Sequence, residues 1–408
     1  MEVKTKSKTK KWIKPRHAFV RNAAFLVVGG YTRLRYGVRV EKFRRKKGQA
    51  YLILFNHQTA ADQFFVGMTF NWPIYYVASE DLFSNGFISK LLRWAVAPVP
   101  IKKQTTDINA VMNCIRIARE GGTIAIAPEG NRTYSGRTVY MNDAVAALAK
   151  KLKLPIALVR IEGGYGVQPR WSDVIRRGKN RVYVSRVVEP EEYKEMSNEQ
   201  LYQLIQQELY VNEAVVDGCY RSSKRAEYLE RAMYVCPYCG LSEFESHGNE
   251  IRCKKCDRKI RYGVDKTLSG VGFDFPYQFV DGWYQYQESF VNGLDLTAMT
   301  DAPLYEDQAA MSEVIVYKHK VPLRKQAKLV LYGDRLEVDP GTEQELVIPF
   351  ADAMAFTVLG RNKLNVYYGQ NLYQFKGDKR FNALKYVNLF HRHRNIIRGN
   401  SDDQFLGL

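Results

Sequence analysis

Two short, mainly apolar runs without charged residues are the clearest elements in the hydrophobic pattern of this chain. They span Tyr51 to Phe55 and Thr123 to Ala127. Unbroken runs of this kind are typical of strands buried on both faces, as in a parallel sheet covered by helices. In such open sheets the functional crevice lies at the carboxyl ends of the strands. The pattern therefore predicts an α/β domain with a mainly parallel sheet, and it directs attention to the residues that follow each run.

Helical periodicity comes next along the chain. A helix is predicted over about 106–120, and its apolar stripe is expected in the core; the stripe consists of Ile108, Val111, Met112 and Ile115. The spacing of Ser197 and Gln200 is that of a capping box. It predicts a second helix that begins there, runs to about Val216 and closes the domain.

The last third of the chain alternates between apolar and polar positions. An aromatic segment, 263–305, connects to this part, and a helix is expected within it around 282–292. A domain of short strands is then expected over 306–398. The strands are expected at 314–317, 327–331, 335–338, 345–348, 353–359, 363–368 and 372–375. An amphipathic segment over 380–397 follows. Several antiparallel strands and one C-terminal helix resemble a pleckstrin-homology-like β domain, built as a barrel. Such a domain could supply membrane or protein contacts, or serve only as a packing scaffold.

A histidine and an aspartate follow the first apolar run. His57 and Asp62 stand five residues apart within the segment Asn56 to Asp62. On one helix they would point roughly 140° apart. If His57 lies in the turn after the strand and Asp62 in the first helical turn, the carboxylate can reach one imidazole nitrogen. That arrangement is a general base held in one tautomer by an orienting acid.

A second motif follows the second apolar run, and the two motifs together resemble those of a known family. The segment Asn56 to Asp62 matches Asn-His-x4-Asp, and Pro128 to Arg132 matches Pro-Glu-Gly-x-Arg, with Asn131 where threonine is more usual. The chain thereby resembles the glycerolipid acyltransferase family, which includes the 1-acylglycerol-3-phosphate acyltransferases. Two further blocks, 99–103 and 154–159, correspond to the remaining family motifs, with Lys103 where arginine is usual. The resemblance covers about residues 25 to 215.

The resemblance implies transfer of a fatty acyl group from an acyl-CoA or acyl-carrier-protein thioester. The acceptor is the free hydroxyl of 1-acylglycerol 3-phosphate or a related lysophospholipid. His57 removes the hydroxyl proton and Asp62 orients His57. The implied substrate-binding residues are Glu129, Gly130, Arg132 and Lys103. Arginine suits a phosphate by charge and geometry, glycine allows the backbone to approach it, and Lys103 is a secondary contact.

Four of the six cysteines form a separate motif. Cys236 and Cys239 make one Cys-x-x-Cys pair, Cys253 and Cys256 another, and 13 residues separate the pairs. This spacing suits tetrahedral zinc binding and resembles a zinc ribbon over 232–262. Four protein ligands leave no open position, so the zinc is expected to be structural. Disulfides are the alternative. The isolated Cys114 and Cys219 are expected to be buried.

The charge is concentrated at the N-terminus. The 408 residues carry 61 basic and 43 acidic side chains, a net charge of +18. Residues 1–45 mix lysine and arginine with aromatic and aliphatic side chains, as in a helix lying on an anionic membrane surface. No stretch is long enough to span a bilayer. The sequence thus predicts a peripheral or monotopic protein at the cytoplasmic face of the cell membrane, with the acyltransferase domain at 46–225. A disordered basic tail leading into a core helix is the alternative.

Two classes of function remain open. In the first, the protein is an enzyme of phospholipid biosynthesis, and the zinc ribbon and β domain position or regulate it. In the second, it is a non-catalytic protein that uses the zinc ribbon and basic surface to bind a membrane, nucleic acid or a protein complex. The first class is favoured because the family's motif residues are all present, namely His57, Asp62, Glu129 and Arg132. An enzyme of this kind is expected to bind a membrane surface, and nucleic acid is the less favoured partner. The acyl-chain length, the thioester carrier and the oligomeric state are not determined by the sequence.

Overall fold

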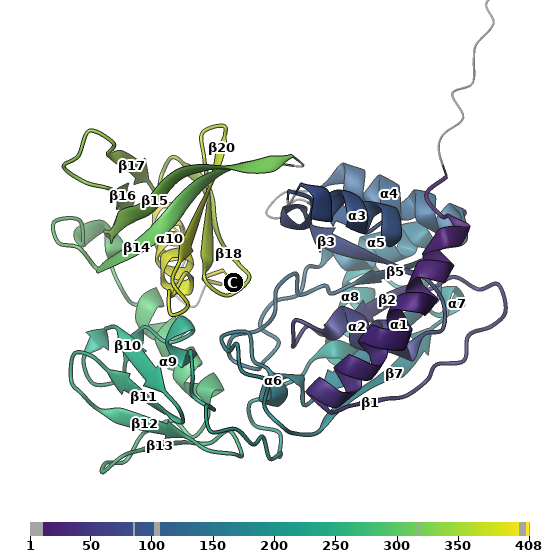
Figure 1. Cartoon of the computed structure of the whole chain (residues 1–408), viewed down its shortest axis with the longest axis horizontal. Coiled ribbons are helices and arrows are strands. Elements are labelled where there is room, and N and C mark those ends of the chain that lie inside the picture. Colours follow the sequence, from purple (N-terminus) through teal and green to yellow (C-terminus); the bar gives the residue numbers. More distant parts are fainter. Residues whose placement is uncertain (1–10, 85, 102–106, 317, 400–404, 408) are drawn as a thin grey trace, which may run out of the picture.

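A computed structural model describes residues 11–84, 86–101, 107–316, 318–399 and 405–407 of the chain. The chain forms two domains side by side (Figure 1). We call residues 11–225 the N-terminal domain and residues 226–399 the C-terminal domain. The two pack against each other through Tyr134 and Trp171, N-terminal side chains that belong to the apolar core of the C-terminal domain.

The N-terminal domain is built on a seven-stranded sheet. In spatial order the strands are β1 (Val38–Val40), β7 (Asn180–Val188), β6 (Ile156–Glu162), β2 (Leu52–Phe55), β5 (Thr123–Ile126), β3 (Ile74–Ser79) and β4 (Val99–Ile101). All neighbouring pairs are parallel except β6 and β7. The two apolar runs form buried strands of a mainly parallel sheet, as predicted, and the structure shows that they are neighbours in it. The sheet begins at Val38, before the expected domain start at residue 46.

Helices cover both faces of this sheet. One face carries α4 (Ile108–Arg119), α5 (Ala144–Leu152) and α8 (Asn198–Leu209), and the other carries α1 (Pro15–Tyr36) and α2 (Asp62–Thr69). Alternate residues of β2 face the two layers, since Leu52 and Leu54 pack in one core and Ile53 and Phe55 in the other. The shorter helices are η1 (Glu80–Phe83), α3 (Phe87–Ala95), α6 (Gly164–Val167) and α7 (Pro190–Tyr193).

Two expectations about these helices are wrong. Half of the stripe predicted for the core of α4 is exposed, with Ile108 71% and Met112 55% exposed, whereas Val111 is half-buried and Ile115 packs against the core. The buried residues of α4 are Ala110, Cys114 and Ile117, so the inward face is rotated from the predicted stripe. The helix α8 ends at Leu209 and not near residue 216, because Tyr210 is extended and the following chain pairs with residues 137 and 138.

The C-terminal domain contains two sheets around one core. The first is antiparallel and consists of β10 (Phe244–His247), β11 (Glu250–Cys253), β12 (Lys259–Tyr262) and β13 (Leu268–Gly270), beside the small pair β8 (Val235–Cys236) and β9 (Gly240–Leu241). Helix α9 (Val280–Asn292) lies between this sheet and the second one (Figure 1). The short helices η2 (Leu229–Arg231) and η3 (Leu296–Ala298) complete the connections.

The second sheet is a curved, antiparallel half-barrel. Its strands in spatial order are β17 (Leu346–Pro349), β16 (Arg335–Val338), β15 (His319–Leu331), β14 (Tyr305–Ile315), β20 (Asn371–Gly377), β19 (Lys363–Tyr368) and β18 (Ala353–Leu359). Helix α10 (Leu384–Ile397) fills its concave side with Leu389 and Phe390. Five of the seven strands lie close to their expected positions, whereas β14 and β15 begin earlier, at Tyr305 and His319.

Candidate active site

The first motif leaves the carboxyl end of β2. His57 lies in the turn after the strand, and Asp62 is the first residue of α2. The Nδ1 atom of His57 is 2.8 Å from Oδ2 of Asp62. The side chain of His57 is 24% exposed and that of Asp62 is fully buried. The contact predicted from the five-residue spacing is thus present, with the carboxylate behind the imidazole.

Several donors fix the Asp62 carboxylate. It accepts hydrogen bonds from the backbone N–H of Gln58 at 2.6 Å, and from the backbone N–H and hydroxyl of Thr59 at 2.9 and 2.6 Å. Its position at the start of α2 also places a negative charge at the positive end of the helix dipole. Because this carboxylate accepts the Nδ1 proton, Nε2 of a neutral His57 carries the lone pair.

The surroundings of His57 keep it neutral. Burial lowers the pKa of His57 and outweighs the opposing effect of the hydrogen bond and charge of Asp62, while Arg132 and Arg170 lower it further. An imidazole with a lowered pKa is unprotonated at neutral pH and can accept a proton there. The geometry and electrostatics of His57 therefore suit a general base.

Glu129, from the second motif, contacts the first one. Its Oε1 atom accepts a hydrogen bond from the backbone N–H of His57 at 2.7 Å. The side chain is buried, and this burial raises the pKa of Glu129 to about 8, although the His57 N–H partly opposes the shift. A carboxyl group with that pKa is mostly protonated at neutral pH. The contact anchors the loop of His57, and a role for Glu129 in holding an acceptor stays a prediction.

Gly130 and Arg132 follow in the same loop. Gly130 has a φ of +67°, which a residue with a side chain adopts only with strain, and an added Cβ would meet no atom within 4 Å. The buried Nη1 atom of Arg132 has no hydrogen-bond partner among the described residues. Burial, together with nearby Arg170 and Arg361, lowers the pKa of Arg132 to about 10, so it remains charged at neutral pH. The last predicted residue of this set, Lys103, lies outside the described residues.

Sequence reasoning missed Arg170 and Arg361. Arg170 follows the block at 154–159 and is 2% exposed. Arg361 is in the turn between β18 and β19 of the C-terminal domain. The position of Arg170, shortly after a block that corresponds to a family motif, was a usable signal. No local pattern connects Arg361 to the site.

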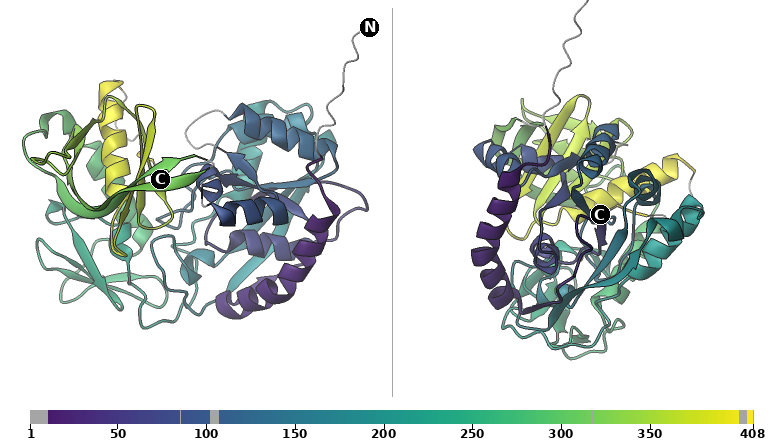
Figure 2. Two further views of the ribbon diagram at one scale, coloured as in Figure 1. Left: turned by 45° about the horizontal axis from the view of Figure 1, so that its top comes forward. Right: turned by 90° about the vertical axis from the view of Figure 1, so that its right-hand side faces the viewer.

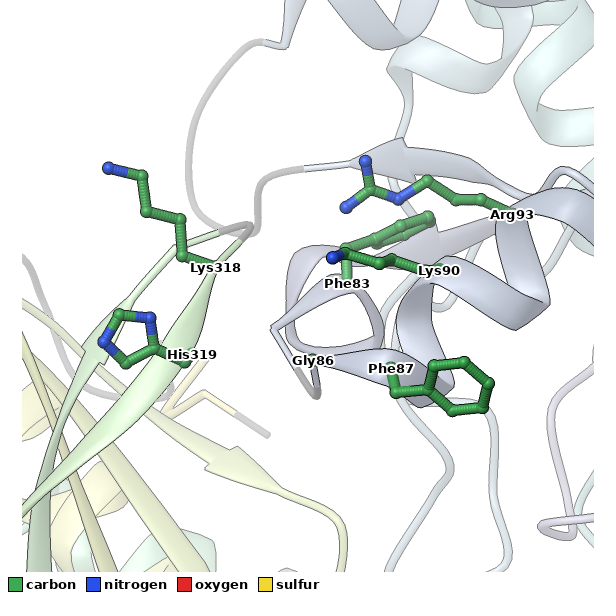
Figure 3. A pocket seen from close by; sticks show the side chains of 7 residues that line it. All are labelled: Phe83, Gly86, Phe87, Lys90, Arg93, Lys318 and His319. Carbon is green, nitrogen blue, oxygen red and sulfur yellow. The ribbon is translucent and has the colours of Figure 1, made fainter.

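A cavity of about 440 Å³ lies between the two domains, beside α3. Phe83, Phe87, Lys90 and Arg93 line it from the N-terminal domain, and Lys318 and His319 from the tip of the β14–β15 hairpin. Figure 3 shows the tip of the hairpin beside the loop that leads into α3, with the side chains of Lys318 and His319 pointing away from that loop. The hairpin therefore brings the half-barrel up to the N-terminal domain at this point.

The four cysteines of the two Cys-x-x-Cys pairs converge. Their Sγ atoms all lie within 4.8 Å of one another, with 3.8 Å between those of Cys236 and Cys256 and 3.6 Å between those of Cys239 and Cys253. A tetrahedral ion with Zn–S bonds of about 2.3 Å requires sulfur atoms about 3.8 Å apart. The donor set thus fits zinc. None of these cysteines forms a disulfide.

The two isolated cysteines differ from each other. Cys114 is buried, as expected, within the core of the N-terminal domain. Cys219 is exposed, so the expectation of burial is wrong there. It lies in the irregular segment between α8 and η2, beside Tyr220, whose ring occupies the interior position instead.

Comparison with known proteins gives matches to one family model and to two acyltransferases. The sequence model of the family described as Acyltransferase matches residues 37–162. The 1-acyl-sn-glycerol-3-phosphate acyltransferase of Bacillus subtilis (strain 168) is 22% identical over 153 residues, which cover 37% of this chain and 73% of that protein. The crystal structure of the 1-acyl-sn-glycerophosphate (LPA) acyltransferase PlsC from Thermotoga maritima matches with a TM-score of 0.37 and 17% identity, covering 47% of this chain and 90% of that one.

Proposed function

Because the N-terminal domain of this chain belongs to the glycerolipid acyltransferase family, we propose that the protein acylates the free hydroxyl of 1-acylglycerol 3-phosphate or a related lysophospholipid. The donor is a long-chain acyl thioester of coenzyme A or acyl carrier protein. The similarity to the Bacillus subtilis 1-acyl-sn-glycerol-3-phosphate acyltransferase supports this choice of acceptor.

The observation that carries the proposal is the contact between His57 and Asp62 at the carboxyl end of β2, with 2.8 Å between Nδ1 and Oδ2. The buried carboxylate fixes the tautomer, and Nε2 has no hydrogen-bond partner among the described residues. Arg132 lies three residues after Glu129, which accepts the backbone N–H of His57, and the charge of Arg132 lowers the pKa of His57. A base and a cation for the phosphate are therefore present at one edge of the sheet.

The reaction needs no protein nucleophile. Nε2 of His57 accepts the proton of the acceptor hydroxyl while the oxygen attacks the thioester carbonyl. The resulting tetrahedral intermediate collapses with cleavage of the carbon–sulfur bond. The proton on Nε2 passes to the departing thiolate, so that an ester and a free thiol are released. Asp62 stabilises the imidazolium that forms between these two proton transfers.

The surface of α1 supports peripheral membrane attachment. Large apolar side chains on this helix are exposed, with Phe19 at 75%, Leu26 at 84% and Leu34 at 90%. Arginines lie among them, as expected for an interfacial helix on anionic lipid. Figure 2 shows α1 on the outside of the N-terminal domain, away from the C-terminal domain. No helix in the described part of the chain is long and apolar enough to span a bilayer.

We also infer that Cys236, Cys239, Cys253 and Cys256 hold a structural zinc ion. The convergence of the four sulfur atoms supports this inference. With four protein ligands, the ion stabilises the fold around the two knuckles and takes no part in acyl transfer.

The proposal is tested by acyl transfer from a long-chain acyl thioester to 1-acylglycerol 3-phosphate on anionic vesicles. We expect turnover by the wild type and loss of turnover in His57→Ala, with unchanged folding. His247→Ala is a matched control, because the side chain of His247 is 71% exposed and lies in the C-terminal domain. Equal transfer by His57→Ala and wild type would overturn the mechanism. Failure of the wild type with all acceptors and carriers would favour a non-catalytic binding protein.

A further inference from the structure

Arg132 and Arg170 place two positive charges in the site without a carboxylate partner. Nη1 of Arg170 donates a hydrogen bond to the backbone carbonyl of Arg132 at 2.8 Å, and its guanidinium lies 4.2 Å from the ring centroid of Tyr134. In the described part of the chain, neither arginine forms an ion pair with Asp or Glu. Burying unpaired charges is costly. This pair of arginines therefore suits an anionic ligand.

Arg361 brings a third guanidinium from the other domain. It lies in the turn between β18 and β19, and its Nη1 atom is 2.6 Å from Oδ1 of Asp173. Asp173 is already paired with Arg231 of η2, through contacts of 3.1 and 2.9 Å to its two oxygens. One carboxylate cannot neutralise both arginines, so this group also carries excess positive charge. The side chain of Arg361 is 26% exposed.

The charges of these arginines act on one another. The positive charges of Arg170 and Arg361 disfavour the charged form of Arg132. After burial, they are the main causes of the lowered pKa of Arg132. Arg361 also acts on Tyr36, the last residue of α1, which in turn responds to Asp62. Contacts give the same link, because Arg361 binds Asp173, which lies three residues after Arg170, and Arg170 holds the backbone carbonyl of Arg132. The segment 170–173 therefore joins the turn between β18 and β19 to the loop of Arg132.

We propose that the C-terminal domain completes the acceptor site by contributing Arg361, which binds the phosphate monoester of the acceptor together with Arg132 and Arg170. The inference rests on the proposed function and extends it to a residue outside the acyltransferase domain. A phosphate monoester carries about −1.5 to −2 charges at pH 7 and three acceptor oxygens, which suits several guanidinium forks. Coenzyme A also carries phosphate groups, so the test must separate the acceptor from the donor.

The decisive variant is Arg361→Gln. It removes the charge and leaves the pair between Asp173 and Arg231 in place, so the fold is expected to persist. The matched control is Lys363→Gln, which removes a charge from β19, two residues further on. Arg361→Lys restores the charge but not the planar fork. Circular dichroism and thermal unfolding establish that all three variants fold.

Binding is measured by isothermal titration calorimetry with 1-hexanoylglycerol 3-phosphate, a soluble acceptor, and separately with coenzyme A. We expect Arg361→Gln to weaken acceptor binding on the order of tenfold to hundredfold, by loss of hydrogen bonds to a charged group. Binding of coenzyme A and the control variant should be unchanged, and Arg361→Lys should recover part of the loss. Unchanged acceptor binding in folded Arg361→Gln, or an equal or larger loss for coenzyme A, would overturn the inference.

Binding and turnover separate this inference from the proposed function. If the wild type binds 1-hexanoylglycerol 3-phosphate through Arg361 but transfers no acyl group, the proposed function fails and the anion site stands. If the wild type transfers acyl groups and Arg361→Gln binds the acceptor as tightly, the proposed function stands and the role of Arg361 is refuted. If the wild type does not bind this acceptor, the role of Arg361 is refuted as well.

Discussion

The carboxyl group of Glu129 accepts a hydrogen bond from the backbone N–H of His57 at 2.7 Å, across 72 residues of sequence. This contact joins the two motifs that follow β2 and β5. Since β2 and β5 are neighbours in the sheet, the loops at their carboxyl ends meet, and the position of His57 depends on both. Glu129 therefore has a positioning role in addition to any contact with a substrate.

Substitution of Glu129 should test its hydrogen bond to His57. Glu129→Ala leaves the buried His57 N–H without a partner, which should cost about 1–3 kcal/mol in free energy of unfolding and lower kcat. Glu129→Gln keeps an acceptor oxygen and should retain much more of both. Urea denaturation and steady-state kinetics measure the two effects. Equal losses in the two variants would show that the hydrogen bond to His57 does not account for the role of Glu129.

The same residue predicts a pH dependence of stability. Burial raises the pKa of Glu129 in the folded protein to about 8, whereas the unfolded chain ionises near the ordinary value of 4.5. The unfolded state then binds fewer protons between these values, so the contribution of Glu129 to stability falls as the pH rises through this range. Glu129→Gln should flatten that fall. Urea denaturation at pH 5 and pH 8.5 measures it, and identical slopes for variant and wild type would contradict the prediction.

The pH dependence of the rate should report the lowered pKa of His57. Burial lowers this pKa below the ordinary 6.5, and the proposed base is active when neutral. The ratio kcat/KM should therefore stay constant through neutral pH and fall only in the acid range, with a midpoint below 6.5. Initial rates between pH 4.5 and 8 measure the midpoint. A midpoint above 6.5 would show that Asp62 outweighs burial.

Asp62→Asn tests the orienting role of the carboxylate. The amide nearly preserves the shape but no longer stabilises the imidazolium or fixes the tautomer. By analogy with other histidine–aspartate pairs, kcat should fall on the order of 10³- to 10⁴-fold. Asp295→Asn, at the start of η3 in the C-terminal domain, is the matched control. If both variants fold and Asp62→Asn retains wild-type turnover, Asp62 does not orient the base.

Removal of metal should destabilise more than the two cysteine knuckles. Cys236 and Cys253 belong to the same apolar core as the half-barrel and α10. Chelation or Cys239→Ser should therefore lower the unfolding temperature of the C-terminal domain as a whole, whereas Cys219→Ser, at an exposed cysteine outside the cluster, should not. Elemental analysis gives the zinc content, and calorimetry gives the transitions. A metal-free protein with unchanged transitions would refute a structural zinc ion.

Membrane attachment is predicted to depend on the exposed face of α1. Replacing Leu26 and Leu34 by aspartate places charges on an apolar surface without disturbing the core, because both side chains are at least 84% exposed. Co-sedimentation with anionic vesicles should be lost in this double variant. Val347→Asp, at an exposed apolar position on β17, should bind like the wild type. Retained sedimentation of the double variant would exclude α1 as the attachment surface.

The sequence by itself determined the features that depend on neighbouring residues. The strands β2 and β5 follow from short apolar runs. Short spacings predict the contact of His57 with Asp62 and the paired cysteines, because a turn or a knuckle fixes such residues within a few ångströms. Five of the seven strands of the half-barrel follow from the alternation of apolar and polar residues in the same way, whereas the early starts of β14 and β15 do not.

Only the tertiary structure decided which surfaces meet. It buried Ala110 and Ile117 of α4 and left Ile108 exposed, although Ile108 and Ile117 are equally hydrophobic, because the rotation of a helix about its axis is set by the surface it packs on. It also brought Arg361 to Asp173, across 188 residues. Contacts between domains leave no periodic trace in a sequence, because they depend on how complete folded surfaces fit together.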